Sequence, residues 1–431
     1  MRPQTGLGTL GGMGPTLLQR LARRAVLARL ARLTAGELTL IEDGASRRFG
    51  PPAAEAGLRA TVRVDDPRFY LRVAWGGAIG AGEAYRDGLW SADDLPALVR
   101  LLARDARSWA DLERGSARLG HLFHRLRHRS RSNTRAGSRR NIAQHYDLGN
   151  DFFERMLDAT WNYSCAVFPH ENASLEEASR FRNDLICRKL GLHPKLDLLE
   201  IGCGWGGLAL HAAGRYGCRV TAVTLSQRQF DLAQRRVAEA GLRERVHVVL
   251  ADYRDLPALL GRRFDRLVSV EMIEAVGERF LDGYFRTCSE LLAPHGAMLL
   301  QAIVIADRFY AHYRRSTDFI QRHVFPGGFL PSLGHLCAIV GHTPNLHVAH
   351  LEDLTAHYPP TLRAWRHRLL AHRQELLARG YSNELLRLWE FYLAYCEGGF
   401  LERTVGDVQL LLAGPDWARA PRWQEPVEAT A

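Results

Sequence analysis

Short hydrophobic runs alternate with longer stretches of mixed polar and hydrophobic residues between about residues 141 and 305. Apolar runs of this length indicate strands, and the stretches between them have the spacing of helices with one apolar face. The alternation predicts a parallel β-sheet covered by helices. The predicted strands are Leu198–Ile201, Cys218–Thr224, Val246–Ala251 and Arg266–Val270, and a helix is predicted from about Leu208.

The residues on either side of this region have other patterns. Leu17–Leu33 places Leu, Ala and Val on one helical face and Arg on the other, which is typical of a helix packed on its own protein or of one lying in a lipid interface. Ala306–Leu412 is predicted to be mostly helical. Ahead of residue 110, the predicted strands are Leu38–Glu42, Thr61–Val64 and Phe69–Trp75, and the predicted helix is Leu95–Asp105.

These changes of pattern divide the chain. Its 431 residues exceed one typical domain. We predict a tail with the amphipathic helix at 1–35, a small α+β domain at 36–110, a basic linker at 111–140, an α/β domain with helical lid insertions at 141–412, and a second tail at 413–431.

The formal net charge of +10 is concentrated in the linker. From Arg114 to Arg140 there are nine Arg, three His and no Asp or Glu. Such a segment is either a solvated spacer or a surface for an anionic partner, such as phospholipid headgroups or nucleic acid.

The cysteines and the apolar runs bear on the compartment. The seven cysteines are scattered and form no C-x-x-C pair, which argues against a disulfide framework or a zinc site and favours a reducing compartment. The sequence has neither a secretory signal pattern nor an apolar run long enough to span a bilayer. We therefore expect a cytoplasmic protein that meets the inner face of the membrane peripherally, from the side.

The strand Leu198–Ile201 runs into a glycine-rich turn, Gly202–Gly207. Glycines let a backbone adopt positive φ and approach a ligand closely, and such a turn is typical of a nucleotide crevice. The spacing here is G-x-G-x-G, with Glu200 two residues before the first glycine. A carboxylate at this point repels phosphate but suits the amino group and sulfonium of S-adenosylmethionine. The turn resembles that of class I methyltransferases, which have a Rossmann-like fold.

The ends of the other predicted strands open on the same crevice, because parallel strands end at one edge of the sheet. Thr224, Ser226 and Gln229 follow the second strand, where they can hydrogen-bond ribose hydroxyls. The third strand ends in Asp252-Tyr253-Arg254, placed to flank an adenine. The fourth runs into Glu271-Met272-Ile273-Glu274.

Several sequence blocks resemble one family, the cyclopropane-fatty-acyl-phospholipid synthases, whose relatives modify mycolic acids. The resemblance runs from about residue 36 to about residue 412, and the FPGG and YSCA sequences are its most specific features. The blocks are HYDLGNDFF (His145–Phe153), YSCAVF (Tyr163–Phe168), LLEIGCGWGG (Leu198–Gly207), VTLSQRQ (Val223–Gln229), FDRLVSVEMIEAVG (Phe264–Gly277), DFIQRHVFPGGFLPS (Asp318–Ser332), HYPPTLRAW (His357–Trp365) and YCEGGF (Tyr395–Phe400).

The resemblance implies roles for individual residues. S-adenosylmethionine would be bound by Tyr163, Ser164, Leu199, Glu200, Gly202, Gly204, Gly206, Thr224, Leu225, Ser226, Gln229, Tyr253 and Arg254. A bicarbonate ion beside the transferred methyl would be held by Cys165, Glu274, Gln301, Ile303 and Tyr358. Cys396 matches a cysteine regarded as an active-site residue of the family. The longer members have an N-terminal domain that binds lipid, which is consistent with Gly82–Leu95 and gives the domain at 36–110 that role.

Two departures from the family pattern bear on the final product. Many bacterial members have EHVG where this chain has Glu274-Ala275-Val276-Gly277, and many have His in place of Gln301. An amide can hydrogen-bond an oxyanion, but it cannot carry a proton as imidazole can. The EMIEAVG form resembles the plant-type branch of the family.

The chemistry implied by the family explains these residues. An isolated alkene is a poor nucleophile, so it needs the electrophilic methyl of a sulfonium held in line and away from water. Methylation leaves a carbocation, and a base must remove a proton from the new methyl before a cyclopropane ring can close. We expect bicarbonate as this base, because a protein carboxylate near a carbocation risks alkylation. Aromatic faces such as Tyr163 can stabilise the passing charge.

The two cysteines of the expected site are open to different interpretations. A nucleophilic Cys396 would need a lowered pKa, which its neighbours Tyr395 and Glu397 do not supply. The mechanism needs no covalent enzyme intermediate, so we favour a structural or pocket-lining role for Cys396. For Cys165 we expect its position to matter more than its thiol.

The expected activity is thus methylene transfer to the cis double bond of an unsaturated phospholipid acyl chain. The alternatives are methyl- or methylene-branching of the same chain, methylation of a small soluble acceptor, and a lipid carrier without activity. Nucleic acid is not an expected partner, because the chain lacks the N/D-P-P-Y/F-type loop of amino methylation. The sequence leaves open whether the protein is a homodimer.

Overall fold

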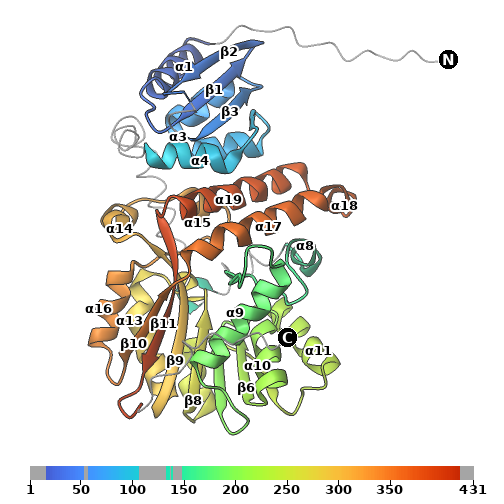
Figure 1. The fold of residues 1–431 in the computed structure, drawn as a ribbon, viewed down its shortest axis with the longest axis vertical. Helices are drawn as coiled ribbons and strands as arrows, with labels where there is room; N and C mark the ends of the chain where they lie inside the picture. The colour runs from blue at the N-terminus through green and yellow to red at the C-terminus, as the bar shows by residue number, and fades with distance from the viewer. Residues whose placement is uncertain (1–15, 53–56, 106–132, 136, 139–147, 418–431) are drawn as a thin grey trace, which may run out of the picture.

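The computed structural model describes residues 16–52, 57–105, 133–135, 137–138 and 148–417 (Figure 1). An N-terminal part with a small sheet lies on one side of a layer of helices, and a large sheet lies on the other. Most of the predicted basic linker, His145, and the ends of both predicted tails lie outside the described residues.

The large sheet has seven strands in the order β10-β11-β9-β8-β5-β6-β7. The five consecutive strands β9, β8, β5, β6 and β7 run parallel to one another, and β11 is antiparallel to both of its neighbours. The strands are β5 (Asp197–Ile201), β6 (Arg219–Thr224), β7 (Val246–Leu250), β8 (Phe264–Val270), β9 (Leu292–Ile305), β10 (His347–Asp353) and β11 (Val405–Ala413). The predicted α/β fold is confirmed, and the four predicted strands agree with β5 to β8 within two residues.

Both faces of this sheet are covered by helices, which is why its strands are apolar on both sides. Leu198 packs on one face, and the adjacent Leu199 packs on the other. One face is covered by α9 (Leu175–Lys189), α10 (Gly207–Tyr216) and α11 (Gln227–Glu239), and the other by α12 (Leu256–Leu260), α13 (Leu281–Leu291) and α16 (Leu333–His342).

The predominantly helical prediction for Ala306–Leu412 misses β10 and β11. Asp407 and Gln409 of β11 are completely buried, so this strand lacks the continuous apolar run that marks an interior strand. The helices of this region are α14 (Asp307–Tyr313), α15 (Phe319–His323), α16, α17 (Tyr358–Ala371), α18 (Arg373–Ala378) and α19 (Asn383–Leu401).

The N-terminal part contains a four-stranded sheet in the order β2-β1-β3-β4, with β1 and β3 parallel. Its elements are α1 (Leu17–Leu30), β1 (Glu37–Glu42), β2 (Ala45–Phe49), β3 (Arg59–Val64), α3 (Arg68–Arg86), β4 (Trp90–Ala92) and α4 (Leu95–Arg104). The predicted helices and the first two predicted strands agree with α1, α4, β1 and β3.

The predicted strand Phe69–Trp75 is wrong, because these residues form the start of α3. Asp66 accepts a hydrogen bond from the backbone N of Arg68 at 2.8 Å, and the adjacent Pro67 fixes φ for a helix start. Phe69 and Val73 are four residues apart and share a hydrophobic cluster, so helical spacing decides over the β-propensity of the aromatic residues.

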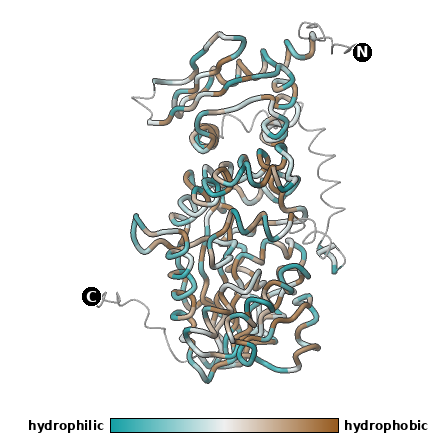
Figure 2. Tube along the Cα trace, turned by 90° about the vertical axis from the view of Figure 1, so that its right-hand side faces the viewer, coloured by the Kyte–Doolittle hydropathy of each residue, from teal (hydrophilic) through white to brown (hydrophobic). Residues whose placement is uncertain are grey.

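One hydrophobic cluster joins the N-terminal part to the helical layer. It contains Leu38 and Leu101 from the first and Trp389 from α19. Helix α19 packs on both α3 and α4, and Figure 2 shows hydrophobic segments on both sides of this contact. Within the part of the chain that the structure describes, no helix is long and apolar enough to cross a membrane.

Candidate active site

A cavity of about 1520 Å³ begins at the carboxyl ends of β5, β6 and β8 and continues through the helical layer into the N-terminal part. Its polar end is lined by the turn after β5 and by Glu271 and Glu274 after β8. Its apolar end is lined by residues of α1, β1, β3, α3 and α4, among them Leu30, Leu40 and Leu98. The crevice expected at the strand ends is therefore one end of a much longer cavity.

The turn after β5 is shaped for a ligand. Gly202 and Gly204 have φ of 91° and 53°, a region that favours glycine. A Cβ on Gly202 would lie 2.6 Å from the side chain of Met272, whereas a Cβ on Gly204 would point into open space. Gly206 is the N-cap of α10. Neither Gly206 nor the buried Leu199 lines the cavity.

Glu200 gives this turn its charge. The side chain is buried, and its Oε2 has no hydrogen-bond partner among the described residues. Burial raises the pKa of Glu200 to about 7, against the opposing effect of the Arg182 guanidinium. A buried carboxylate oxygen that faces a cavity without a donor fits a cationic group, so the residues present fit S-adenosylmethionine.

The residues expected on the ribose side divide into two groups. Thr224, Leu225 and Gln229 line the cavity, and the Thr224 hydroxyl donates to Oε1 of Gln229 at 2.8 Å. This bond leaves the Gln229 amide nitrogen as a donor for a ligand. Ser226 does not line the cavity, because its hydroxyl caps α11 by accepting from the backbone N of Gln229.

On the expected adenine side, Arg254 is held in place by Asp252. The guanidinium donates to the Asp252 carboxylate at 2.8 and 2.6 Å and lies 5.3 Å from the centre of the Tyr253 ring. It also donates to the backbone oxygen of Asn133 at 3.1 Å. Tyr253 and Arg254 both line the cavity, so the predicted pair is brought together.

Aromatic rings line the middle of the cavity. The hydroxyl groups of Tyr163 and Tyr392 are hydrogen-bonded at 3.1 Å, and the Tyr163 ring centre lies 5.1 Å from that of Trp365. Tyr358 is stacked on Phe400, with ring centres 4.0 Å apart. Ser164 also lines this region. These faces supply the aromatic surroundings that a passing positive charge would need.

Glu271, the first residue after β8, occupies the centre of the polar end. Its Oε1 accepts from the backbone N of Cys165 at 2.7 Å and from Nε2 of Gln301 at 2.9 Å, and its Oε2 accepts from the Tyr358 hydroxyl at 2.7 Å. Its φ of 47° lies in the left-handed region, which costs a non-glycine residue about 1–3 kcal/mol. A strained residue held by three hydrogen bonds marks a functional position.

Glu274 lies beside Glu271. Its Oε1 accepts from the backbone N of Ile303 at 2.6 Å, and its Oε2 has no hydrogen-bond partner among the described residues. Burial, and then the charge of Glu271, raise the pKa of Glu274 to about 8. Glu274 is therefore largely protonated at neutral pH.

Gln301 connects Glu271 to a second buried acid, Asp407. The Gln301 amide nitrogen donates to both carboxylates, at 2.9 and 3.0 Å, and its oxygen accepts from Nε2 of Gln409 at 2.9 Å. Both amide hydrogens and the oxygen are thus used, so an amide fits this point better than an imidazole. Gln301 itself is completely buried and does not line the cavity.

Arg182 of α9 compensates part of this negative charge. The side chain is 1% exposed. Burial raises the pKa of Glu200, Glu271 and Asp407, and the Arg182 guanidinium opposes that effect at each of them. Without this cation, the acids would be far more costly to bury in ionised form.

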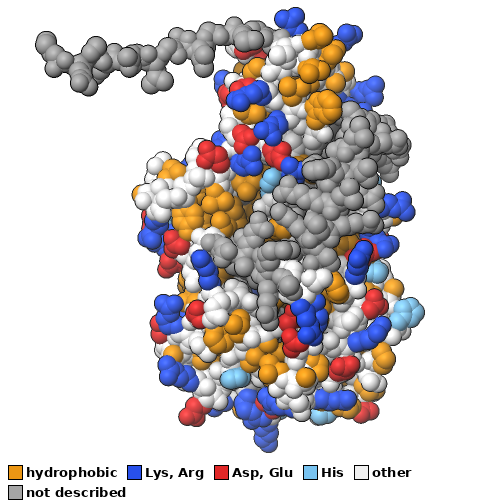
Figure 3. All heavy atoms as spheres, turned by 180° about the vertical axis from the view of Figure 1, so that it is seen from behind, with side chains coloured by type: hydrophobic (Ala, Val, Ile, Leu, Met, Phe, Trp, Pro, Cys, Tyr) orange, Lys and Arg blue, Asp and Glu red, His pale blue; other side chains and the backbone are white. Residues whose placement is uncertain are grey.

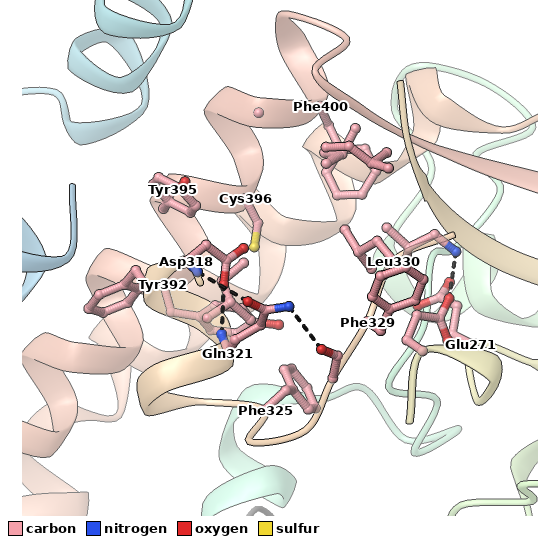
Figure 4. A pocket seen from close by; sticks show the side chains of 18 of the residues that line it. Glu271, Asp318, Gln321, Phe325, Phe329, Leu330, Tyr392, Tyr395, Cys396 and Phe400 are labelled. Atoms are coloured by element: carbon pink, nitrogen blue, oxygen red, sulfur yellow. Dashed lines mark hydrogen bonds between the residues drawn. The ribbon is translucent and has the colours of Figure 1, made fainter. Parts of the chain in front are cut away.

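Neither cysteine of the site has the surroundings of a nucleophile. Cys165 is completely buried, burial raises the pKa of its thiol, and it contributes its backbone N to Glu271. Burial, and then Asp318, raise the pKa of the Cys396 thiol. Figure 4 shows Cys396 on the side of the pocket that also carries Asp318 and Tyr392, apart from Glu271. These environments fit the expected positional and pocket-lining roles.

The residues expected around bicarbonate do come together, but around protein carboxylates. Cys165, Gln301 and Tyr358 donate to Glu271, and Ile303 donates to Glu274. An added anion would find these donors engaged, and it would add negative charge beside acids whose pKa values are already raised. The residues present therefore do not fit a bicarbonate ion.

The sequence analysis places Glu271 at the crevice without giving it a role, and it does not identify Asp407 or Arg182. The place of Glu271 directly after the fourth strand of an α/β sheet was a usable signal, because ligands bind at such strand ends. No comparable sequence feature marks Asp407 or Arg182. Asp407 lies in β11, a strand that was not predicted, and Arg182 lies in an amphipathic helix, where arginine is common.

Comparison with known proteins identifies the family. The family model for mycolic acid cyclopropane synthetase matches residues 133–410. The chain belongs to this family. It is 37% identical over 390 residues to the tuberculostearic acid methyltransferase UfaA1 of Mycobacterium tuberculosis, covering 88% of each chain. It is also 37% identical over 361 residues to the cyclopropane-fatty-acyl-phospholipid synthase of Escherichia coli K12, covering 81% of this chain and 86% of that one.

Solved structures of the family share the fold. The mycolic acid cyclopropane synthase CmaA1, in complex with SAH and CTAB, superposes with a TM-score of 0.59 at 31% identity, covering 64% of this chain and 98% of that one. The cyclopropane synthase MmaA2 from Mycobacterium tuberculosis gives the same TM-score, identity and coverage. The protein is thus an S-adenosylmethionine-dependent methyltransferase of the cyclopropane-fatty-acyl-phospholipid synthase family, with a class I methyltransferase fold.

Proposed function

We propose that this enzyme transfers a methylene unit from S-adenosylmethionine to the cis double bond of an unsaturated acyl chain in a phospholipid, forming a cyclopropane ring. The observation that carries the proposal is the single cavity that joins the cofactor turn to an apolar channel in the N-terminal part. A small soluble acceptor would not need a channel of this length.

The two ends of the cavity suit the two reactants. S-adenosylmethionine supplies an electrophilic methyl group when it is bound at the turn. Glu200 holds its cationic part, and Thr224 and Gln229 hold its ribose. The acyl chain lies in the apolar channel, where each buried methylene contributes about 0.8 kcal/mol. The double bond then lies at the level of Tyr163 and Tyr358, whose rings exclude water and stabilise developing positive charge.

Exposed apolar side chains beside the apolar end of the cavity support a phospholipid as the substrate. Leu17, Leu18 and Leu21 of α1 and Trp75 of α3 are 73%, 62%, 54% and 61% exposed. The same two helices line the apolar end of the cavity through Val26, Leu30 and Val73. In Figure 3, hydrophobic side chains gather beside Lys and Arg on the N-terminal part. Apolar side chains flanked by cations are typical of a surface that enters a lipid interface.

A second outcome remains in competition with ring closure. The name of the relative UfaA1, a tuberculostearic acid methyltransferase, favours a methyl- or methylene-branched chain from the same carbocation. The substrate and the first step are then unchanged, and only the fate of the cation differs.

Vesicles of a monounsaturated phospholipid, incubated with S-adenosylmethionine and the purified protein, test the proposal. We expect each modified acyl chain to gain one CH₂ by mass spectrometry and a cyclopropane ring by NMR. Vesicles of a saturated phospholipid are the control and should gain nothing. An exocyclic methylene or a methyl branch would establish the second outcome, and an unmodified lipid would refute both.

A further inference from the structure

The donors that surround Glu271 point to the base of the reaction. The family resemblance assigns the backbone N of Cys165, the Gln301 side chain and the Tyr358 hydroxyl to a bicarbonate ion. In this chain all three donate to the Glu271 carboxylate, at 2.7, 2.9 and 2.7 Å. Glu271 therefore lies where an external base would otherwise be bound.

We propose that the Glu271 carboxylate is the built-in base that removes the proton from the new methyl group, so that this enzyme works without bicarbonate. The inference rests on the proposed function, since it concerns the second half of the same reaction. It assigns to a residue of the chain the step that a bound anion would carry out.

The hydrogen bonds leave Glu271 one free acceptor position. A carboxylate offers about four lone-pair sites, two on each oxygen. Oε1 uses both of its sites for Cys165 and Gln301, whereas Oε2 uses one for Tyr358. The remaining site on Oε2 is the position for a proton. Glu271 lines the cavity, so its side chain borders the space that a bound chain would occupy.

The balance of the reaction needs no further reactant. The π electron pair of the double bond forms the new C–C bond to the methyl carbon, and the C–S bond breaks with its pair remaining on sulfur. The neighbouring chain carbon is left positive. Oε2 of Glu271 takes a proton from the new methyl, and the electron pair of that C–H bond closes the third side of the ring.

The surroundings favour proton transfer over alkylation of Glu271. Three accepted hydrogen bonds occupy three of the roughly four lone-pair sites and lower the nucleophilicity of the carboxylate toward carbon. Burial raises the pKa of Glu271, which makes it a stronger base than an exposed glutamate. Glu274 is largely protonated near neutral pH, so it does not compete for the same proton. The left-handed φ of 47° holds the side chain at this point.

The first test compares the wild-type enzyme with and without bicarbonate. Vesicles of monounsaturated phospholipid are incubated with S-adenosylmethionine in buffer stripped of carbon dioxide, and sodium bicarbonate is added to half of the samples. We expect the same rate of ring formation in both. A rate that collapses without bicarbonate would overturn the inference while leaving the proposed function intact. No lipid product in either sample would overturn the proposed function itself, and the inference with it.

Two variants of Glu271 locate the base. Glu271→Gln keeps the size of the side chain but removes its basicity, and we expect turnover to fall by about 10²-fold or more with unchanged affinity for S-adenosylmethionine. Glu176→Gln, in an exposed ion pair of α9, is the matched control and should keep full turnover. Full turnover of Glu271→Gln would overturn the inference.

Glu271→Gly is the second variant, and it tests the same residue if the glutamine disturbs the site. Glycine accepts the positive φ and vacates the donors, so added bicarbonate or formate should restore activity in a saturable manner. Rescue by a small carboxylate is not expected of a residue with a purely structural role. Loss of activity that neither anion restores, accompanied by loss of cofactor binding in calorimetry, would show that Glu271 only supports the fold.

Discussion

The two ends of the cavity differ in almost every physical respect. At the large sheet, Glu200, Glu271 and Glu274 face the cavity and Asp407 lies buried behind them, with Arg182 as the compensating cation. In the N-terminal part the cavity lining is largely aliphatic. Strands of the small sheet and the helices α1, α3 and α4 contribute it. Burying acids costs stability, whereas burying aliphatic side chains provides it.

This difference separates chemistry from binding. In the proposed reaction, a methyl donor with positive charge and a departing proton both need the acids, although their burial costs stability. The apolar end makes no such demand, and its contact with the proposed acyl chain would supply binding energy remote from the reacting atoms. Such remote binding can position the double bond at the polar end. Changes at the two ends should therefore produce different kinds of defect.

The largest effect is expected from a change confined to the polar end. Gly202→Val would place a Cβ 2.6 Å from Met272 at a backbone with φ of 91°, so the turn after β5 must move. We expect calorimetry to detect no binding of S-adenosylmethionine, in a protein that still binds vesicles. Normal cofactor affinity in the folded variant would show that the turn is not the cofactor site.

The converse change fills the apolar end. Ala74→Trp inserts a large ring where Ala74 of α3 lines the cavity, and it displaces about four methylenes of an acyl chain, a loss of about 3 kcal/mol or 10²-fold in kcat/KM. Affinity for S-adenosylmethionine should not change. The matched control is Ala45→Trp on the exposed surface of β2, which should retain wild-type kinetics. Equal kinetics for the two variants would mean that the chain binds elsewhere.

A smaller effect is expected in the stability of the ligand-free protein as pH changes. The pKa of Glu200 is about 7 and that of Glu274 about 8, both above the ordinary value for glutamate. The folded state therefore holds protons that the unfolded state has lost, and stability falls as pH rises from about 5 to 8. For Glu200 we expect a loss of about 3 kcal/mol, obtained from chemical denaturation as the difference between wild type and Glu200→Gln. A difference that does not vary with pH would place Glu200 in water.

The smallest effect concerns the exposed side chains next to the apolar end. Trp75→Ser removes one ring from the proposed membrane surface and should weaken vesicle binding by roughly threefold, or about 0.7 kcal/mol. Turnover of a detergent-dispersed lipid should be unaffected. The measurement is co-sedimentation with anionic vesicles, and unaltered sedimentation would exclude Trp75 from the contact.

The sequence could predict features that follow local rules, but not those that depend on packing between distant segments. The strands from β5 to β8 and the glycine turn follow local rules of periodicity and backbone geometry, and they agree with the structure within two residues. The strand predicted for Phe69–Trp75 is wrong because a short run of aromatic and apolar residues favours a strand when it is read by itself. Its helical state depends on Asp66 and Pro67 ahead of it and on packing.

The sequence could identify site residues only where one short segment contains every residue that defines the function. Glu200 and Gly202 belong to such a segment, and both line the cavity. The environment of Glu271 is assembled from donors about 30, 90 and 110 positions away in the sequence, so no local pattern reveals it. The expectation that these donors hold bicarbonate came from the family resemblance. In the structure, the same donors bind the Glu271 carboxylate.

The central claim is that the methyl donor and the acyl chain meet in one cavity and that the proton leaves from the transferred methyl. S-adenosylmethionine carrying a fully deuterated methyl group tests it directly, with monounsaturated phospholipid vesicles as acceptor. We predict a cyclopropane that retains two of the three deuterium atoms, because Glu271 removes the third. A product that retains all three, or a lipid that carries no deuterium, would contradict the account.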